Sequence, residues 1–330
     1  MTPEMRRVFA ERNGQDPAAG GPESLSMGDH TSEGALSQAT PADAALAAFL
    51  EVYEGSIATL CTEQDYHELM LRYLQRCRAG GVVYSEISFD PQAHLTRGVA
   101  LSTVMDGFAS ARAEGAERLG VESELIMCFH LDKPVENALD VLRDAAPFAD
   151  QILGVGLDNN EVEGWAPMFG PVLERARSLG YRTTAHCACD MPGALESIRT
   201  CIVDVGLERI DHGINILEDP ELVATARELG VCFTVCPTRR VGEDAPRRIP
   251  QLRGMLDAGL LVNVNSDDPG LFASGPLDQL LVGVAGTGLF DAADLCRMAA
   301  NSFTGSWLPP ARRDHYLAAV DEYAAAAGAI

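Results

Sequence analysis

Two adjacent acids, Asp267 and Asp268, directly follow the run LLVNVNS at residues 260–266. The apolar residues of that run predict a buried strand, so both carboxylates come at its end. Neighbouring side chains of an extended strand point to opposite sides, but Pro269 predicts a turn that could bring both acids to one side. One acid could then bind a metal ion while the other holds a substrate, and we assign these roles to Asp267 and Asp268 respectively.

Two histidines stand near the ends of two other strand-like runs, His186 in RTTAHCAC (182–189) and His212 in ERIDHGI (208–214). A lone histidine is more often a core or rim residue than a ligand, so the prediction depends on its combination with Asp267. Imidazole and carboxylate both suit zinc, and we therefore predict His186 and Asp267 as metal ligands. His212 is the candidate general acid and base, because the pKa of a histidine lies near neutrality.

Strand-like apolar runs alternate with helical patterns from Ala45 onward, which predicts an α/β fold with a parallel sheet covered by helices. The expected architecture is a (β/α)8 TIM barrel that comprises residues 1–330 as a single domain, with its first strand missing. Within it, residues 14–44 are rich in Gly, Ser, Pro and Ala and predict a flexible low-complexity loop. The predicted strands are 81–89, 123–131, 151–158, 182–189, 208–214, 231–237 and 260–266.

Acids and histidines gather at the carboxyl ends of these predicted strands. In a barrel those ends meet on one face, where catalytic groups sit. Polar residues are also simply better tolerated at strand ends, but this many in register favours a functional site. The residues concerned are Asp90, His130, Asp158, His186, Asp211, His212, Asp267 and Asp268.

Composition excludes several classes of partner. Lys and Arg number 25 against 48 Asp and Glu, a net charge of −23, which argues against nucleic acid and anionic membranes. A small-molecule substrate remains compatible with this charge. Nine cysteines in a chain of this length read as core thiols rather than a secreted disulfide scaffold. We expect a cytoplasmic protein, because no apolar run resembles a signal peptide or a membrane span.

Nine motifs together resemble the adenosine/adenine deaminase family of zinc-dependent purine aminohydrolases, and two of them, FDPQAHLTRG and NSDDP, look closest to its adenine deaminase branch. The resemblance extends from about Ala10 to Tyr323. It implies a (β/α)8 barrel and a zinc ion that activates water to replace the 6-amino group of a purine, with release of ammonia. The motifs are AERNG, FLEVYEGSIATLCTEQDYHEL, SEISFDPQAHLTRG, GVGLD, TAH, ERIDHGINILEDPELV, TVCP, VNSDDP and NSFTGSW.

Carried over by position, the resemblance implies that His186 and Asp267 are zinc ligands and that His212 assists the attacking water. It implies that Asp268 contacts N7 of the purine. We also expect Asp158, at the end of the GVGLD motif, to contribute to substrate binding.

The sequence departs from the family at three places. The His-x-His pair of the family's first strand, which supplies two further zinc ligands, has no counterpart among the seven histidines of this chain. The family's His-Ala-Gly-Glu is replaced by HCACD, so Cys189 stands where the Glu would donate a proton, and Asp190 is the candidate replacement. Alternatively, Cys187 or Cys189 replaces a lost zinc ligand. Strand 231–237 is followed by two arginines, of which Arg239 is a candidate contact for an anionic group of the substrate.

These departures leave two explanations open. Either the first strand is encoded ahead of Met1, or it has been lost and the barrel has another task. The first function hypothesis is therefore a deaminase acting on an adenine, an adenosine or a modified purine. The alternative is a catalytically silent or chemically altered member of the fold that binds a purine-like ligand or a protein partner. A homodimer is the common default for a soluble enzyme.

Overall fold

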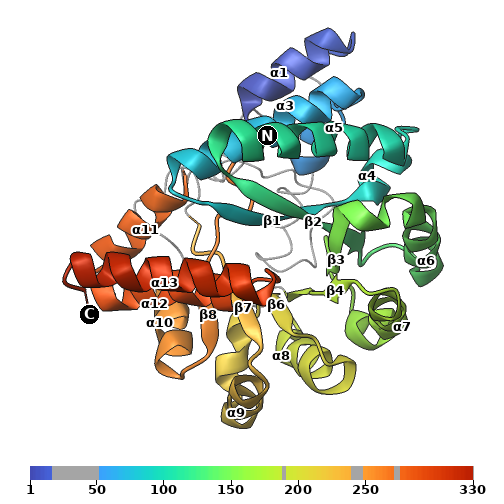
Figure 1. The fold of residues 1–330 in the computed structure, drawn as a ribbon. Helices are drawn as coiled ribbons and strands as arrows, with labels where there is room; N and C mark the ends of the chain where they lie inside the picture. The colour runs from blue at the N-terminus through green and yellow to red at the C-terminus, as the bar shows by residue number, and fades with distance from the viewer. Residues whose placement is uncertain (17–51, 188–190, 239–247, 271–275, 330) are drawn as a thin grey trace, which may run out of the picture.

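The computed structural model describes residues 1–16, 52–187, 191–238, 248–270 and 276–329. Eight parallel strand segments form two four-stranded sheets, in the orders β1-β2-β3-β4 and β5-β6-β7-β8 (Figure 1). The segments are β1 Tyr84–Phe89, β2 Glu122–His130, β3 Ile152–Asp158, β4 Arg182–Thr183, β5 His186–Cys187, β6 Arg209–His212, β7 Cys232–Val235 and β8 Leu261–Val264.

The two sheets belong to one curved wall. β4 and β5 are two halves of the predicted strand 182–189, separated by Thr184 and Ala185. Backbone hydrogen bonds continue through this break, from the Thr184 N–H to the Val155 carbonyl at 3.1 Å and from the Asp211 N–H to the Ala185 carbonyl at 2.9 Å. The seven predicted strands therefore all exist as parts of a (β/α)8 barrel.

The barrel wall is open between β1 and β8. These two strands end the strand order, and no other strand within the described ranges pairs with their outer edges. A cavity of about 1250 Å³ follows the opening, from Asp268 at the carboxyl ends of the strands to Glu86 and Ser306 further down. The prediction of a missing first strand is thus confirmed for the described part of the chain.

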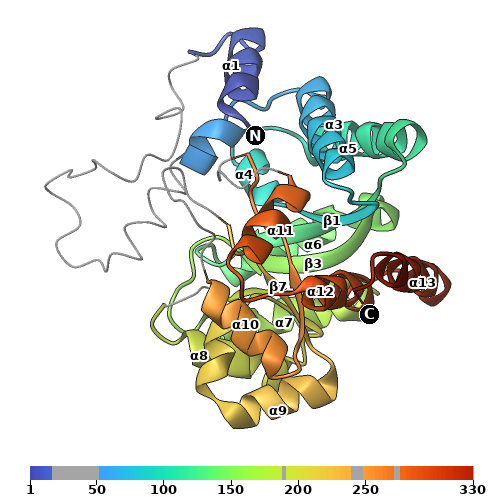
Figure 2. The same ribbon diagram turned by 90° about the vertical axis from the view of Figure 1, so that its left-hand side faces the viewer.

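Helices cover the outside of the wall. Figure 2 shows α1, α3 and α5 on one side of the strands and α8, α9 and α10 on the opposite side. The helices are α1 Pro3–Arg12, α3 Glu63–Ala79, α4 Pro91–Leu95, α5 Leu101–Glu114, α6 Val135–Asp144, α7 Trp165–Ser178, α8 Ala194–Arg199, α9 Pro220–Leu229, α10 Ile249–Asp257, α11 Leu277–Gly286, α12 Ala292–Thr304 and α13 Pro310–Ala326, with short turns η1 Gly115–Leu119, η2 Ala146–Gln151, η3 Thr200–Val205 and η4 Ile214–Glu218.

Local sequence signals explain where several helices begin and end. Thr62 and Asp65 form a reciprocal capping box at the start of α3, which satisfies backbone N–H groups there. Asp219 caps α9 by accepting from the Leu222 N–H, and Gly230 ends that helix with a φ of 68°. In the described part of the chain, no helix combines the length and the apolar character that crossing a membrane requires.

The core lies mainly between the strands and the covering helices. β2 is buried along nearly its whole length, as expected of a parallel strand covered on both faces. Phe129 and Phe233, from β2 and β7, and Trp165, at the start of α7, are among the largest fully buried side chains. Burial of each such side chain stabilises the fold by about 1.5–3 kcal/mol.

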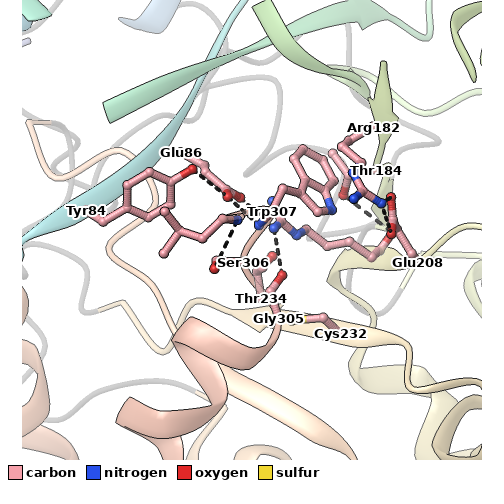
Figure 3. Close-up of polar contacts among 12 residues, drawn as sticks. Tyr84, Glu86, Arg182, Thr184, Glu208, Cys232, Thr234, Gly305, Ser306 and Trp307 are labelled. Carbon is pink, nitrogen blue, oxygen red and sulfur yellow. Dashed lines mark hydrogen bonds and ion pairs between the residues drawn. The ribbon is translucent and has the colours of Figure 1, made fainter. Parts of the chain in front are cut away.

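A buried ion pair links the two halves of the barrel below the carboxyl ends of the strands. Nη2 of Arg209, in β6, lies 2.5 Å from Oε2 of Glu86, in β1. The Arg209 guanidinium also donates to the Gly305 carbonyl at 2.8 Å and stacks 3.7 Å above the Trp307 ring. The Glu86 carboxylate accepts hydrogen bonds from the backbone N–H of Trp307 at 2.7 Å and from the Tyr84 hydroxyl at 3.0 Å (Figure 3). These contacts join β1, β6 and the segment after α12 without a backbone ladder.

Candidate active site

The polar residues at the strand ends converge on one end of the cavity, as the sequence predicted. Asp90, Asp158, His186, Asp211, His212, Asp267 and Asp268 all line it. His130 lies beside Asp90, with its Nε2 3.7 Å from Oδ2 of the acid. All of these residues except His130 therefore line one cavity at the carboxyl end of the barrel.

His186 is oriented by an acid from a neighbouring loop. Its Nδ1 lies 2.7 Å from Oε1 of Glu161, a side chain only 6% exposed that also accepts a hydrogen bond from the indole of Trp165. Burial lowers the pKa of His186, but the hydrogen bond and the charge of Glu161 outweigh it and raise that pKa overall. Because Nδ1 is engaged by Glu161, the other ring nitrogen remains available to a ligand.

His212 and Asp267 complete the group around His186. The rings of His186 and His212 are perpendicular, with centroids 4.8 Å apart. Nε2 of His212 lies 3.9 Å from Oδ2 of Asp267. Burial and the positive charge of His186 lower the pKa of His212, which favours its neutral imidazole.

A thiol also reaches this group. One ligand atom from each of His212, Cys236 and Asp267 lies within 4.8 Å of the others. Imidazole, thiolate and carboxylate are the three ligand types that zinc binds in proteins, so this donor set fits a zinc ion. His186 lies beside this group, with its ring centroid 4.8 Å from that of His212.

The surroundings of Asp268 favour its protonated form. Burial and the charge of the adjacent Asp267 raise its pKa to about 8. A protonated carboxyl can donate a hydrogen bond as well as accept one, which suits contact with an unprotonated ring nitrogen.

A second polar cluster lies at the ends of β1, β2 and β3. Asp90 accepts a hydrogen bond of 2.6 Å from the Tyr53 hydroxyl. Burial would raise the pKa of Asp90, but its interactions with His130, Asp158 and Tyr53 lower it below the usual value. Burial and the charge of Asp90 raise the pKa of Asp158 well above its usual value. These two carboxyl groups therefore have opposite tendencies to ionise.

Several predicted residues are outside the described part of the chain, and Cys187 faces away from the site. Asp190, Cys189 and Arg239, and nearly all of the predicted loop 14–44, are outside the described residues. Cys187 is fully buried and its thiol contacts that of Cys201, in the outer layer, so it does not face His186's ligand side. Packing against a covering helix was the simpler reading of Cys187, and its position agrees with that reading.

Three residues of the site were missed by sequence reasoning. Glu161 stands in a loop after β3 without any periodic signal, and Tyr53 precedes the first predicted strand. Cys236, in contrast, directly follows the end of β7, as the predicted site residues follow the ends of their own strands. Its position could have identified it as a candidate ligand.

The chain is similar to several known proteins. A family model described as adenosine deaminase matches residues 24–323. The chain is 39% identical to an uncharacterised deaminase of Schizosaccharomyces pombe over 281 residues, covering 85% of this chain and 83% of that protein. It is 39% identical to an adenine deaminase of Streptomyces coelicolor over 330 residues, covering 98% and 92%.

Solved structures show the same likeness. The crystal structure of an adenine deaminase from Arthrobacter aurescens is 34% identical and superimposes with a TM-score of 0.82, covering 98% of this chain and 94% of that one. A zinc-bound amidohydrolase from Burkholderia ambifaria is 25% identical, with a TM-score of 0.74 over 84% of this chain and 80% of that one.

Proposed function

Because the chain belongs to the adenosine deaminase family, whose members are hydrolases acting on C–N bonds, we propose that it removes the 6-amino group of a purine or purine-like substrate with release of ammonia. The observation that carries this proposal is the meeting of His186, His212, Asp267 and Asp268 at one end of one cavity. These four residues come from three separate strands, so their convergence is a property of the fold.

His186 and Asp267 are the proposed zinc ligands, with Cys236 within reach. Glu161 would fix the ring of His186 and make it a better electron donor. A zinc ion bound there would supply the Lewis acid that makes water nucleophilic at neutral pH. A ligand atom of Cys236 lies within 4.8 Å of one from Asp267 and one from His212, so Cys236 is the candidate for a further ligand beside Asp267.

His212 is the proposed acid and base. Its lowered pKa leaves the imidazole neutral near pH 7, so it can accept a proton from the attacking water. The same nitrogen can then return the proton to the departing amino group, since ammonia is a far better leaving group than its anion. Asp267 and the ring of His186 lie close enough to hold His212 in position.

Asp268 is the proposed anchor for the substrate ring. A protonated Asp268 can donate to a ring nitrogen such as N7 of a purine, which has a lone pair and no hydrogen. Asp158 lines another part of the same cavity and is a proposed contact for the substrate. The roles of Asp190 as proton donor and of Arg239 as an anion contact stay predictions, as does a homodimer.

Ammonia release tests the proposal. We would incubate the 330-residue chain, supplied with zinc, with adenine, adenosine and N6-methyladenine, and measure ammonia or methylamine. Turnover of at least one 6-amino substrate, abolished by His212→Asn, is the expected result. Absence of turnover on all three by a chain that binds zinc would contradict it. The catalytically silent alternative is not favoured, because His212, Asp268 and Asp158 line the same cavity.

A further inference from the structure

The structure points to a second cation site, at the carboxyl ends of β1, β2 and β3. We propose that Asp90, His130 and Asp158 bind a divalent transition-metal cation of the zinc type, independently of the site at His186 and Asp267. One ligand atom from each of the three residues lies within 4.8 Å of the others. Asp90 follows β1 directly, and His130 and Asp158 are the last residues of β2 and β3.

The spacing of the donor atoms fits an ion between them. Nε2 of His130 lies 3.7 Å from Oδ2 of Asp90, which is too long for a hydrogen bond. Ligand atoms that each bind zinc at about 2.1 Å lie about 3.0–3.4 Å apart. A small inward movement of these side chains would therefore produce a coordination sphere.

The contacts around the three residues bear on metal binding. Nδ1 of His130 lies 3.9 Å from Oδ1 of Asp132, and its Nε2 lies 3.4 Å from Nδ2 of Asn159, which would have to move aside for a cation. The Tyr53 hydroxyl fixes Asp90 at 2.6 Å. Oδ1 of Asp158 is buried and has no hydrogen-bond partner among the described residues. A bound cation would satisfy this atom.

Burial and charge are compatible with a bound cation. The Asp90 and His130 side chains are 9% and 6% exposed, and no Lys or Arg in the described ranges forms an ion pair with Asp90 or Asp158. Two carboxylates buried side by side are costly unless a proton or a cation lies between them. A divalent cation would neutralise both.

The cation would face the substrate cavity. Asp90 and Asp158 both line it, whereas His130 stands behind them. Three protein ligands leave a tetrahedral zinc-type ion with one open position, which water or a polar atom of a ligand in the cavity could take. The proposed second cation site does not require that the first site, at His186 and Asp267, catalyses deamination.

Metal stoichiometry tests the proposal. The 330-residue chain would be stripped with a chelator, titrated with Co²⁺ and with Zn²⁺, and measured by elemental mass spectrometry and by Co²⁺ visible absorption. We expect one bound ion to disappear in His130→Leu and in Asp158→Asn, while the ion that depends on His186 remains. His67→Gln is the matched control, because His67 also pairs with an acid, Glu114, but outside this cluster.

The outcomes are distinct. Loss of an ion in both cluster variants supports the site, even if His186→Ala changes nothing and the first site fails. Unchanged stoichiometry in both variants overturns it, as does a chain that binds no ion or only the ion lost in His186→Ala. Thermal melting of each variant by circular dichroism separates loss of metal from loss of fold.

Discussion

His212 and Asp267 face each other across the ends of β6 and β8, with Nε2 of the histidine 3.9 Å from Oδ2 of the acid. Both residues have left-handed backbones, with φ of 61° and 55°. Residues other than glycine adopt that conformation at a cost of about 1–2 kcal/mol. Such strain collects at functional sites, where the surrounding structure maintains it. Substitutions at these positions should therefore use residues that tolerate a positive φ.

Replacing His212 by asparagine should lower turnover by about 10²–10⁴-fold, because the general acid and base is lost. Asparagine tolerates a left-handed backbone, so the fold should keep its melting temperature. Steady-state ammonia release and thermal melting check the two parts. Turnover within threefold of the unaltered chain would remove His212 from the mechanism.

Replacing Glu161 by glutamine should weaken zinc binding by about 10–100-fold, because the acid that orients His186 loses its charge. Competition with a chromophoric chelator measures the affinity. The control is Glu163→Gln, which changes an exposed acid two residues further on and should leave the affinity unchanged. Equal affinities in both variants would mean that Glu161 has no part in the metal site.

Breaking the buried pair of Glu86 and Arg209 should destabilise the fold strongly. Glu86→Gln leaves the Arg209 charge buried without its partner, at a cost of about 3–5 kcal/mol in the free energy of unfolding. Urea denaturation measures the loss. The double variant Glu86→Gln/Arg209→Met should lose less than the sum of the single variants, because neither charge is then left alone.

The exposed pair of Arg182 and Glu208, drawn in the same view, is the natural control (Figure 3). Its side chains are 52% and 45% exposed, so Arg182→Met should cost at most about 1 kcal/mol. Similar losses for the buried and the exposed pair would contradict the importance of the Glu86–Arg209 link.

Asp65 should make stability depend on pH at the acid end. Burial would raise its pKa, but hydrogen bonds from Asn13, Thr62 and the Cys61 N–H lower it below the ordinary value of 3.8. A folded-state pKa below the unfolded one means that the stabilisation is complete above about pH 4 and is lost as pH falls through the folded-state pKa. The advantage of the unaltered chain over Asp65→Asn should therefore shrink between pH 5 and pH 2. Urea denaturation at several pH values measures this, and an advantage independent of pH would refute it.

The sequence predicted best those site residues that follow an apolar, strand-like run. Asp267, Asp268, His186 and His212 follow apolar runs, and the parallel arrangement of the strands brings them together. Glu161 and Tyr53 reach the site from segments without periodicity, so only tertiary structure reveals them. Arg209 and Glu86 are 123 positions apart, from 209 and 86. Their pairing could not be predicted, because no local pattern records which distant charges meet.

The opening between β1 and β8 also bears on how the chain folds. All backbone pairing among the described strands joins segments that are consecutive in the sequence. In a closed barrel the last strand must pair with the first, a contact of very high contact order that slows folding. Here the contacts between the most distant residues involve side chains, such as the hydrogen bond from the backbone N–H of Trp307 to the Glu86 carboxylate. We expect each four-stranded sheet to form by pairing of strands that are consecutive in the sequence. The contacts among Glu86, Arg209 and Trp307 should form last.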